Sequence, residues 1–359
     1  MLLLFDARYI RTDFHDGISR YSTELSNALA ALTNVTFLIC DLRQLHFLPD
    51  NCRFLLIHSP TSIKEPLTAL ILNRHRPDVV FSPMQTIGSI GRRFKLIVTS
   101  HDMIYFRHKT PPSGLNVVIR LCWRLYHATY LFERIVLNQA DMVATVSQTT
   151  KAEFLKVKLT KHDIVVIPNA PQQLTRFLPS PPSGEQPPTN LVYMGSFMSY
   201  KNVETLIRGL EFLPGFTLHL LSRASDHRKA ELQALVQPGS HVIWHNGVTD
   251  QVYAQLLATD AMLVTASLDE GYGLPIAEAL ALGVPAVVSD LPIFHEVAGE
   301  GALYFTPDSP RDFADAVLQL QNPQTQRHVI TAGKKHISQY SWRTSAKILL
   351  RTIKSSLLQ

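Results

Sequence analysis

The residues best suited to chemistry lie in the segment DEGYGLPIAEALALGVPAVVSD, which begins at Asp269. A predicted strand ends near this point, and the turn that follows contains Gly271, Gly273 and then Pro275. Glycine lets the backbone approach a ligand closely, and proline suits a helix start, where the N–H has no helical partner. Because such a helix start attracts anions, the turn from Gly271 to Leu274 is predicted to cradle a diphosphate.

Two carboxylates flank this turn, Glu270 just before it and Glu278 in the first turns of the helix. Carboxylates beside a phosphate would repel it unless they bind something else. The hydroxyl groups of a ribose and a hexose are suitable donors, so the pair indicates a nucleotide-sugar site. The alternative is that Glu278 complements the helix dipole, an effect of about 0.3–1 kcal/mol, and that Glu270 is solvated.

Short β-branched or leucine-rich runs alternate with helix-period segments along the chain, a pattern typical of βαβ units and parallel sheets. A helix is predicted over 17–32, a second over 116–139, and an amphipathic one after Trp342. Thirteen strands are predicted, at 2–5, 35–39, 54–57, 79–81, 96–99, 142–146, 164–167, 191–194, 217–221, 242–244, 262–265, 286–288 and 303–305.

The alternation is interrupted by PQQLTRFLPSPPSGEQPPTN, which starts at Pro171. Proline removes backbone donors and fixes φ, so this stretch is predicted to be a linker without regular structure. We therefore expect an N-terminal domain over 1–170, a linker over 171–189, a C-terminal domain over 190–338 and a last helix over 339–359. Open parallel sheets bind ligands at the carboxyl ends of their strands, so we expect a cleft there.

The composition fits a folded protein: of 359 residues, 46% are hydrophobic and 18% charged, with a net charge of +5. The excess charge attracts anions weakly, whether nucleotide, nucleic acid or membrane. Three cysteines without a close pair favour a reducing cytoplasm. The first apolar run is too short for a signal peptide, and no stretch reaches the roughly 18 apolar residues of a membrane span.

Several common motifs are absent from the sequence. It has no Asp-x-Asp pair for a nucleotide-bound metal, no Walker lysine motif, and no GxGxxG after the first strand. His241 and His245 share one face of a predicted strand, but no third metal ligand is evident. We therefore expect a metal-independent site without a cofactor.

Together these segments resemble the retaining family-four glycosyltransferases. Glu270 to Glu278 fits that family's E-x7-E motif. DGISRYSTELSNAL is similar to its glycine loop and first helix, TSHDMIYF to its His-Asp segment, and ADMVATVSQTTKAEF to its serine motif. VVIPNA, YMGSFMSYKNVETLIRGL and YSW resemble the strand before the linker, the start of the second domain and the return helix. The resemblance implies a GT-B fold, with two Rossmann-like domains facing across a cleft and a last helix returning to the first domain.

The resemblance also implies donor-binding roles in the second domain. Glu278 would bind the donor ribose, Glu270 the hydroxyls of the donor sugar, and Lys201 the diphosphate; an exposed lysine at a helix start is the alternative for Lys201. Many family members carry an arginine where this chain has Ser196. Either Ser196 binds the phosphate or another base compensates. The further donor-binding residues are Gly271, Tyr272, Gly273 and Leu274, and the compensating bases considered are Arg20, Arg107 and Arg223.

In the first domain the resemblance points to four residues. Gly17 would lie in the loop that approaches the diphosphate or acceptor, a plain turn glycine being the alternative. His101 would lie beside the transferred sugar. His101 and Glu270 are the two predicted catalytic residues. Asp102 and Asp16 are weaker candidates for acceptor binding.

The reaction implied is transfer of a hexose from a nucleotide sugar to a glycan or lipid-linked acceptor in surface polysaccharide or glycolipid synthesis. The motifs look most like bacterial mannosyltransferases, so GDP-mannose is the first expectation; a UDP-sugar-dependent glucosyl- or N-acetylglucosaminyltransferase and a GT-B epimerase remain alternatives. No nucleic-acid partner is expected. The arginine-rich helix over 116–139 could rest on the inner face of an anionic membrane, or be a solvated helix with a core face.

Overall fold

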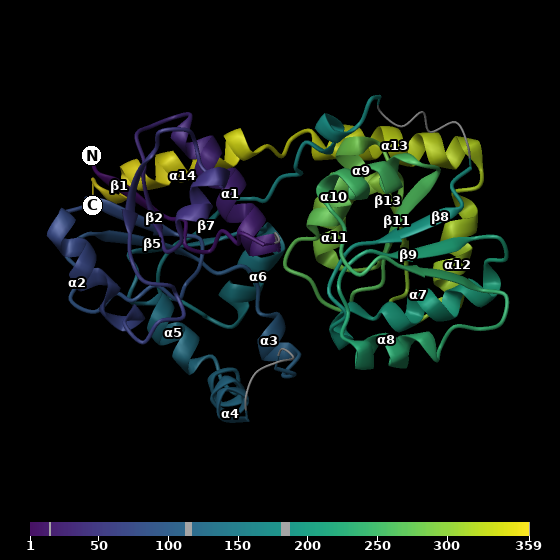
Figure 1. Cartoon of the computed structure of the whole chain (residues 1–359), viewed down its shortest axis with the longest axis horizontal. Coiled ribbons are helices and arrows are strands. Elements are labelled where there is room, and N and C mark those ends of the chain that lie inside the picture. Colours follow the sequence, from purple (N-terminus) through teal and green to yellow (C-terminus); the bar gives the residue numbers. More distant parts are fainter. Residues whose placement is uncertain (14–15, 112–116, 181–186, 359) are drawn as a thin grey trace. The chain divides into compact units, whose positions relative to one another are not determined.

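The chain folds as two compact units, each built around its own sheet (Figure 1). Unit 1 comprises Met1–Asn169 and Tyr340–Gln359, and unit 2 comprises Ala170–Gln339. The computed structural model describes residues 1–13, 16–111, 117–180 and 187–358. Among the helices in these ranges, none combines the length and the apolar character that crossing a membrane requires.

Unit 1 contains a seven-stranded parallel sheet in the order β3-β2-β1-β4-β5-β6-β7. The seven strands predicted in the first part of the chain are confirmed, with ends shifted by one residue. Leu4, Val80 and Val98 of three central strands are at most 2% exposed, so the sheet forms the centre of the core. The strands are β1 (Leu3–Asp6), β2 (Thr36–Ile39), β3 (Arg53–Leu56), β4 (Val79–Ser82), β5 (Lys95–Thr99), β6 (Met142–Thr145) and β7 (Ile164–Val166).

Helix α1 (Gly17–Ala30) follows the first strand and ends two residues earlier than predicted. Its buried face includes Tyr21, Leu25 and Leu29, at the three- and four-residue spacing of a helix packed on one side. The last helix, α14 (Trp342–Ser356), belongs to unit 1 and packs against α1. The predicted return of the C-terminal helix to the N-terminal domain is therefore confirmed.

The single helix predicted over 116–139 is wrong. The structure has two helices, α4 (Val117–Tyr126) and α5 (Leu131–Leu137), and residue 116 lies outside the described residues. Burial raises the pKa of Glu133 on α5, whose carboxylate accepts hydrogen bonds from Tyr126 Oη at 2.6 Å and Ser100 Oγ at 3.3 Å. Both helices also expose leucines, among them Leu121 and Leu125 of α4 and Leu131 of α5, which are more than half exposed.

The remaining helical segments of unit 1 are short, apart from α6, and connect the strands. Several are short 3-10 helices. They are η1 (Leu42–Phe47), η2 (Glu65–Leu67), α2 (Thr68–Leu72), η3 (Asn73–His75), α3 (Ile104–Arg107) and α6 (Gln148–Lys156).

Unit 2 contains a six-stranded parallel sheet in the order β10-β9-β8-β11-β12-β13. The six strands predicted for the second part of the chain are confirmed. Leu191, Met262 and Val287 are fully buried in its core. The strands are β8 (Asn190–Tyr193), β9 (Thr217–Leu220), β10 (His241–Trp244), β11 (Ala261–Thr265), β12 (Ala286–Ser289) and β13 (Ala302–Phe305).

Helices cover the sheet of unit 2, and one short helix lies in the predicted linker. The linker segment 171–189 was expected to lack regular structure, but η4 (Leu174–Phe177) forms there and packs against α9 and α10, with Leu174 only 2% exposed. Linker residues 181–186 lie outside the described residues. The other helices are η5 (Ser199–Lys201), α7 (Val203–Gly209), η6 (Leu210–Phe212), α8 (Asp226–Gln233), α9 (Asp250–Ala258), α10 (Leu274–Leu282), α11 (Pro292–Ala298), η7 (Gly299–Gly301), α12 (Pro310–Gln319) and α13 (Pro323–Ile337).

Candidate functional site

The strand order of unit 2 marks where a ligand would bind. From β8 the chain proceeds outward through β9 and β10, then returns to pair β11 with β8 and proceeds the other way. Open α/β sheets bind ligands at such a reversal, outside the carboxyl ends of the two strands. The loop after β8 leads to Lys201, and the loop after β11 leads to Glu270. The fold therefore places both predicted donor-binding side chains at its switch point.

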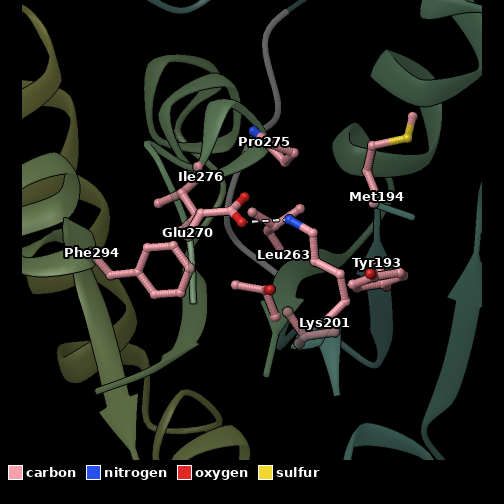
Figure 2. A pocket seen from close by; sticks show the side chains of 12 residues that line it. Tyr193, Met194, Lys201, Leu263, Glu270, Pro275, Ile276 and Phe294 are labelled. Atoms are coloured by element: carbon pink, nitrogen blue, oxygen red, sulfur yellow. Dashed lines mark hydrogen bonds and ion pairs between the residues drawn. The ribbon is translucent and has the colours of Figure 1, made fainter. Parts of the chain in front are cut away.

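A small hollow lies at this switch point. Lys201 and Glu270, which both line it, form an ion pair (Figure 2). Lys201 Nζ lies 2.5 Å from Glu270 Oε2, although 69 residues separate the two in sequence. Their side chains are only 13% and 15% exposed. Charge-assisted hydrogen bonds of this kind are short and strong, so a phosphate that binds Lys201 must displace Glu270 or share the ammonium with it.

The walls of the hollow are mainly apolar and aromatic. Tyr193 from the end of β8 and Phe294 from α11 lie on opposite sides of the ion pair in Figure 2, and Leu263 and Ile276 also line the hollow. Tyr193 donates a hydrogen bond from its hydroxyl to the carbonyl of Ser196 at 2.6 Å, which fixes the loop after β8. An apolar wall with a few fixed polar groups is typical of small-molecule sites.

The glycine turn forms the start of α10, where no side chain at Gly273 keeps a ligand away from the backbone. Gly273 is the N-cap of α10 with φ +97°, a conformation that a side chain strains, and a Cβ there would meet Phe294 at 3.0 Å and Ile276 at 3.1 Å. Leu274 is the first helical residue and Pro275 the second. Pro275 has no N–H, and the Ile276 N–H donates to the Gly273 carbonyl at 3.0 Å, so the Leu274 N–H and the dipole of α10 are what favour an anion at this end.

Not every predicted residue lines the hollow. Lys201, Glu270 and Gly273 do, whereas Glu278 is buried at 4% exposure on α10 and Tyr272 is buried before it. Gly271 is also buried, and Leu274 is half-buried at the helix start. Ser196 is exposed, so its side chain is available to solvent and makes no part of the wall.

Two arginines lie near the loops that follow β8 and β9. Arg228 of α8 donates from Nε to the Phe197 carbonyl at 3.0 Å and pairs with Glu204 at 2.5 Å, which holds the loop that contains Ser196. Sequence reasoning missed Arg228, because its partners are 31 and 24 residues away. Arg223, one of the predicted compensating bases, is exposed just after β9, the strand beside β8.

The other two predicted bases lie in unit 1. Arg107 pairs with Glu153 at 3.0 Å, and Arg20 donates its backbone N–H to the Asp16 carbonyl within α1. Of the three, Arg223 is therefore the one that shares the strand-end edge of unit 2 with Lys201.

In unit 1, His101 follows the carboxyl end of β5. Its Nε2 lies 2.8 Å from the Pro83 carbonyl, which only accepts, so Nε2 carries the hydrogen and Nδ1 is the acceptor in the neutral ring. Burial lowers the pKa of His101, against the opposing effects of the Pro83 carbonyl and the Asp16 carboxylate. The neutral imidazole is thus favoured at this position.

The carboxylates of the two weaker candidates of unit 1 both accept backbone hydrogen bonds near a helix start, but only Asp16 is a helix cap. Asp16 caps α1 by accepting from Ser19 N at 2.8 Å, and its other oxygen pairs with Arg11 at 2.7 Å. Asp102 accepts from Ile104 N at 2.9 Å at the start of α3. Gly17 is the exposed first residue of α1.

No metal centre forms within the described ranges, where groups of three or more His, Cys, Asp or Glu side chains able to hold an ion are absent. His245, half of the histidine pair noted in the sequence, meets His219 instead, with His245 Nε2 3.1 Å from His219 Nδ1. Burial lowers the pKa of both rings.

Solved structures of glycosyltransferases share this two-unit architecture over nearly the whole chain. Sucrose-phosphate synthase of Thermosynechococcus elongatus superimposes with a TM-score of 0.75 at 17% identity, covering 98% of each chain. HepE of Anabaena, in complex with UDP and glucose, superimposes with a TM-score of 0.72 at 17% identity, covering 99% of this chain and 100% of its own. The two parallel sheets and these neighbours define a GT-B fold with two Rossmann-like domains.

Family models narrow the class further. Residues 15–170 match the model described as Glycosyltransferase Family 4, and residues 188–322 match the one described as Glycosyl transferases group 1. The chain belongs to the family-four glycosyltransferases, as the sequence motifs predicted.

Curated relatives include bacterial mannosyltransferases and the lipopolysaccharide 1,6-galactosyltransferase of Escherichia coli, which is 26% identical over 171 residues and covers 46% of this chain and 45% of its own length. The serotype-specific mannosyltransferase WbdA of Escherichia coli is 33% identical over 122 residues, which cover 33% of this chain and 14% of the length of WbdA. The O-antigen chain mannosyltransferase RfbU of Salmonella typhimurium is 22% identical over 322 residues, covering 85% of this chain and 87% of RfbU. This chain thus spans a small part of WbdA and most of RfbU.

Proposed function

We propose that this protein is a retaining, metal-independent hexosyltransferase that uses a nucleotide sugar. Unit 2 would bind the donor and unit 1 the acceptor. The observation that supports this most directly is the ion pair between Lys201 and Glu270 beside the left-handed Gly273 cap, at the switch point of the unit 2 sheet. A cation, a carboxylate and a helix start are what a diphosphate joined to a hydroxyl-rich sugar requires.

In the proposed reaction, the bond between the anomeric carbon and the diphosphate oxygen breaks, and its electron pair stays on the diphosphate. The acceptor hydroxyl oxygen bonds to the same face of that carbon, and its proton passes to the leaving diphosphate. The protein orients the partners and stabilises the charge that develops on the phosphate. Lys201 and the Leu274 N–H at the start of α10 would supply that stabilisation, Glu270 would hold the sugar hydroxyls and Glu278 the ribose.

His101 would contact substrate as a neutral ring. Its Nε2 hydrogen is held by the Pro83 carbonyl, so Nδ1 is the atom that can accept a hydrogen bond from a substrate hydroxyl. Because burial lowers the pKa of His101, it serves as an acceptor near neutral pH rather than as a cation.

Mannose from GDP-mannose is our first donor assignment, for synthesis of a surface polysaccharide. It rests on the mannosyltransferase relatives WbdA and RfbU, at the low identities given above. A UDP-sugar is the second candidate, because a solved neighbour was obtained with UDP-glucose. An epimerase on the same architecture would need no acceptor.

A thermal-shift panel of GDP-, UDP- and ADP-sugars, followed by a transfer assay with the best donor, tests the proposal. We expect one nucleotide sugar to raise the Tm, transfer to proceed in EDTA, and the product to keep the donor's anomeric configuration by NMR. If the donor alone is converted to an epimer, the protein is an epimerase and the proposed transfer is wrong. A product with the opposite anomeric configuration would refute retention. Loss of transfer in EDTA that Mg²⁺ restores would refute metal independence.

We also propose that the acceptor is lipid-linked and reached at the inner face of an anionic membrane. Helices α4 and α5 expose large apolar side chains beside the exposed Arg120 and Arg124, a combination that favours anionic lipid surfaces. Co-sedimentation with phosphatidylglycerol vesicles should exceed that with phosphatidylcholine vesicles and fall on Leu121→Ser with Leu125→Ser. Equal binding of the parent and the double variant would contradict this. The apolar side chains are Val117, Ile119, Leu121, Leu125, Leu131, Phe132 and Ile135, which are 47% to 83% exposed.

A further inference from the structure

We infer that Tyr21 and Trp342 are positioning residues for His101, so that the first residue of the C-terminal helix orients the histidine at the end of β5. The inference rests on the substrate contact proposed for His101. It assigns a task to two aromatic residues that the reaction itself does not use.

The contact between Tyr21 and His101 is direct. Their ring centroids are 4.9 Å apart and their planes meet at 84°, an edge-to-face arrangement of the kind that aromatic pairs prefer. Tyr21 lies on the buried face of α1 and is fully buried, so its ring cannot move away without disturbing the core.

The hydrogen bond to Pro83 alone does not orient the His101 ring. It holds the Nε2 atom, while the tilt of the ring plane about that atom needs a second contact. Tyr21 supplies that contact through a buried ring that lies nearly perpendicular to the imidazole. The direction in which Nδ1 presents its lone pair is therefore set by the Tyr21 ring.

Tyr21 is in turn supported by Trp342. The two ring centroids are 5.9 Å apart with an interplanar angle of 68°. Trp342 is 9% exposed and is the first residue of α14, whose cap Ser341 accepts from Thr344 N at 3.1 Å. Since the chain re-enters unit 1 at Tyr340, the ring that supports Tyr21 sits within the first residues after that crossing.

The test compares Tyr21→Leu and Trp342→Leu with Tyr21→Phe and Trp342→Phe, which keep an aromatic ring. Misplacing a reacting group by about 1 Å costs about 100-fold in rate, so we expect the leucine variants to lower kcat by about 10- to 100-fold. The phenylalanine variants should keep most of the kcat. Affinity for the nucleoside diphosphate, measured by calorimetry, should be unchanged in all four, because the predicted diphosphate partner Lys201 lies in unit 2.

Leu349→Ala is the matched control, because Leu349 lies on the same helix and is fully buried but makes no aromatic contact with Tyr21. It should lower the Tm without lowering kcat when each variant is assayed well below its own Tm. If Leu349→Ala lowers kcat as much as the leucine variants do, the aromatic contacts act only through stability and the inference is wrong. Should Tyr21→Leu fail to fold, Trp342→Leu carries the same comparison.

The ring proton resonances of His101, assigned with His101→Asn, test the geometry without relying on activity. A neighbouring aromatic ring shifts these resonances, so they should move in Tyr21→Leu and stay near the parent position in Tyr21→Phe. Unmoved resonances in Tyr21→Leu would overturn the inference. If they move as expected but His101→Asn keeps full kcat, the positioning stands and the substrate contact proposed for His101 is wrong.

Discussion

Replacing either member of the Lys201 and Glu270 pair should have opposite effects on nucleotide binding. The ammonium of Lys201 is held by Glu270 at 2.5 Å, so an incoming diphosphate competes with that carboxylate. Lys201→Met removes the cation and should weaken binding of a nucleoside diphosphate. Glu270→Gln removes the competitor, so it should leave that binding unchanged or tighten it, while weakening binding of the complete nucleotide sugar.

The size of the effect follows from the geometry. A hydrogen bond to a charged group contributes about 1.5–3 kcal/mol, which corresponds to a loss of about 10- to 150-fold in affinity for Lys201→Met. Removing one side of a buried ion pair costs about 3–5 kcal/mol. Because the two side chains keep 13% and 15% exposure, we expect solvent to reduce this to about 2 kcal/mol, or about 4–8 °C in Tm.

Isothermal titration calorimetry with GDP, UDP and the matching sugars measures these affinities. Lys335→Met, at an exposed lysine of α13, is the control for loss of one positive charge. If Lys201→Met leaves nucleoside diphosphate binding unchanged, Lys201 is not the diphosphate partner. If Glu270→Gln weakens that binding as much as Lys201→Met does, Glu270 does not compete with the diphosphate. If Lys335→Met also weakens nucleoside diphosphate binding, the net positive charge of the protein, rather than this ion pair, governs affinity.

Four further outcomes follow from the structure. Gly273→Ala should lower the Tm in calorimetry more than Gly239→Ala does. Both positions have positive φ, but only at Gly273 does the new Cβ meet Phe294 and Ile276. Equal Tm shifts would show that these two side chains move aside without cost. Glu278→Gln should weaken binding of the preferred donor in the same titration, and unchanged affinity would remove the ribose contact. Burial lowers the pKa of His101, so the unfolded state binds more protons there as pH falls below about 6.5 and stability declines. His101→Gln should therefore lessen the decline in unfolding free energy on acidification, measured by urea titration, and an unaltered slope would contradict this. Arg223→Ala should raise the donor KM by about two- to fivefold, the scale of an exposed ion pair, whereas Arg311→Ala, at another exposed arginine, should not. Equal effects of the two substitutions would mean that Arg223 is not the base that compensates for Ser196.

The sequence predicted the strands well because each is a short β-branched or leucine-rich run bounded by polar turns. It also located Glu270 and Gly273, since a glycine turn before a proline-started helix is a local signal. The contact between Glu270 and Lys201 is not local. It depends on the pairing of β8 with β11, which spacing along the chain does not reveal.

Errors arose where tertiary contacts decide the local structure. The break between α4 and α5 accompanies the burial of Glu133 under Tyr126 and Ser100, a contact that helical periodicity cannot predict. The carboxylate of Asp16, a weaker candidate for acceptor binding, also caps α1, and its acceptor role stays a prediction. Arg228 was missed because an arginine on a polar helix gives no sign of binding a distant carbonyl.

The crossing of the chain back into unit 1 reverses the usual order of folding during synthesis. Domains generally fold from the N-terminus onward as the ribosome adds about 5–20 residues per second. Here α14 can pack against α1 only after the whole of Ala170–Gln339 has been synthesised. At that speed the synthesis of this segment takes roughly 10 to 35 s. The unit that is translated first is thus completed last, and a chain that stops before Trp342 would leave Tyr21 without its contact to the Trp342 ring.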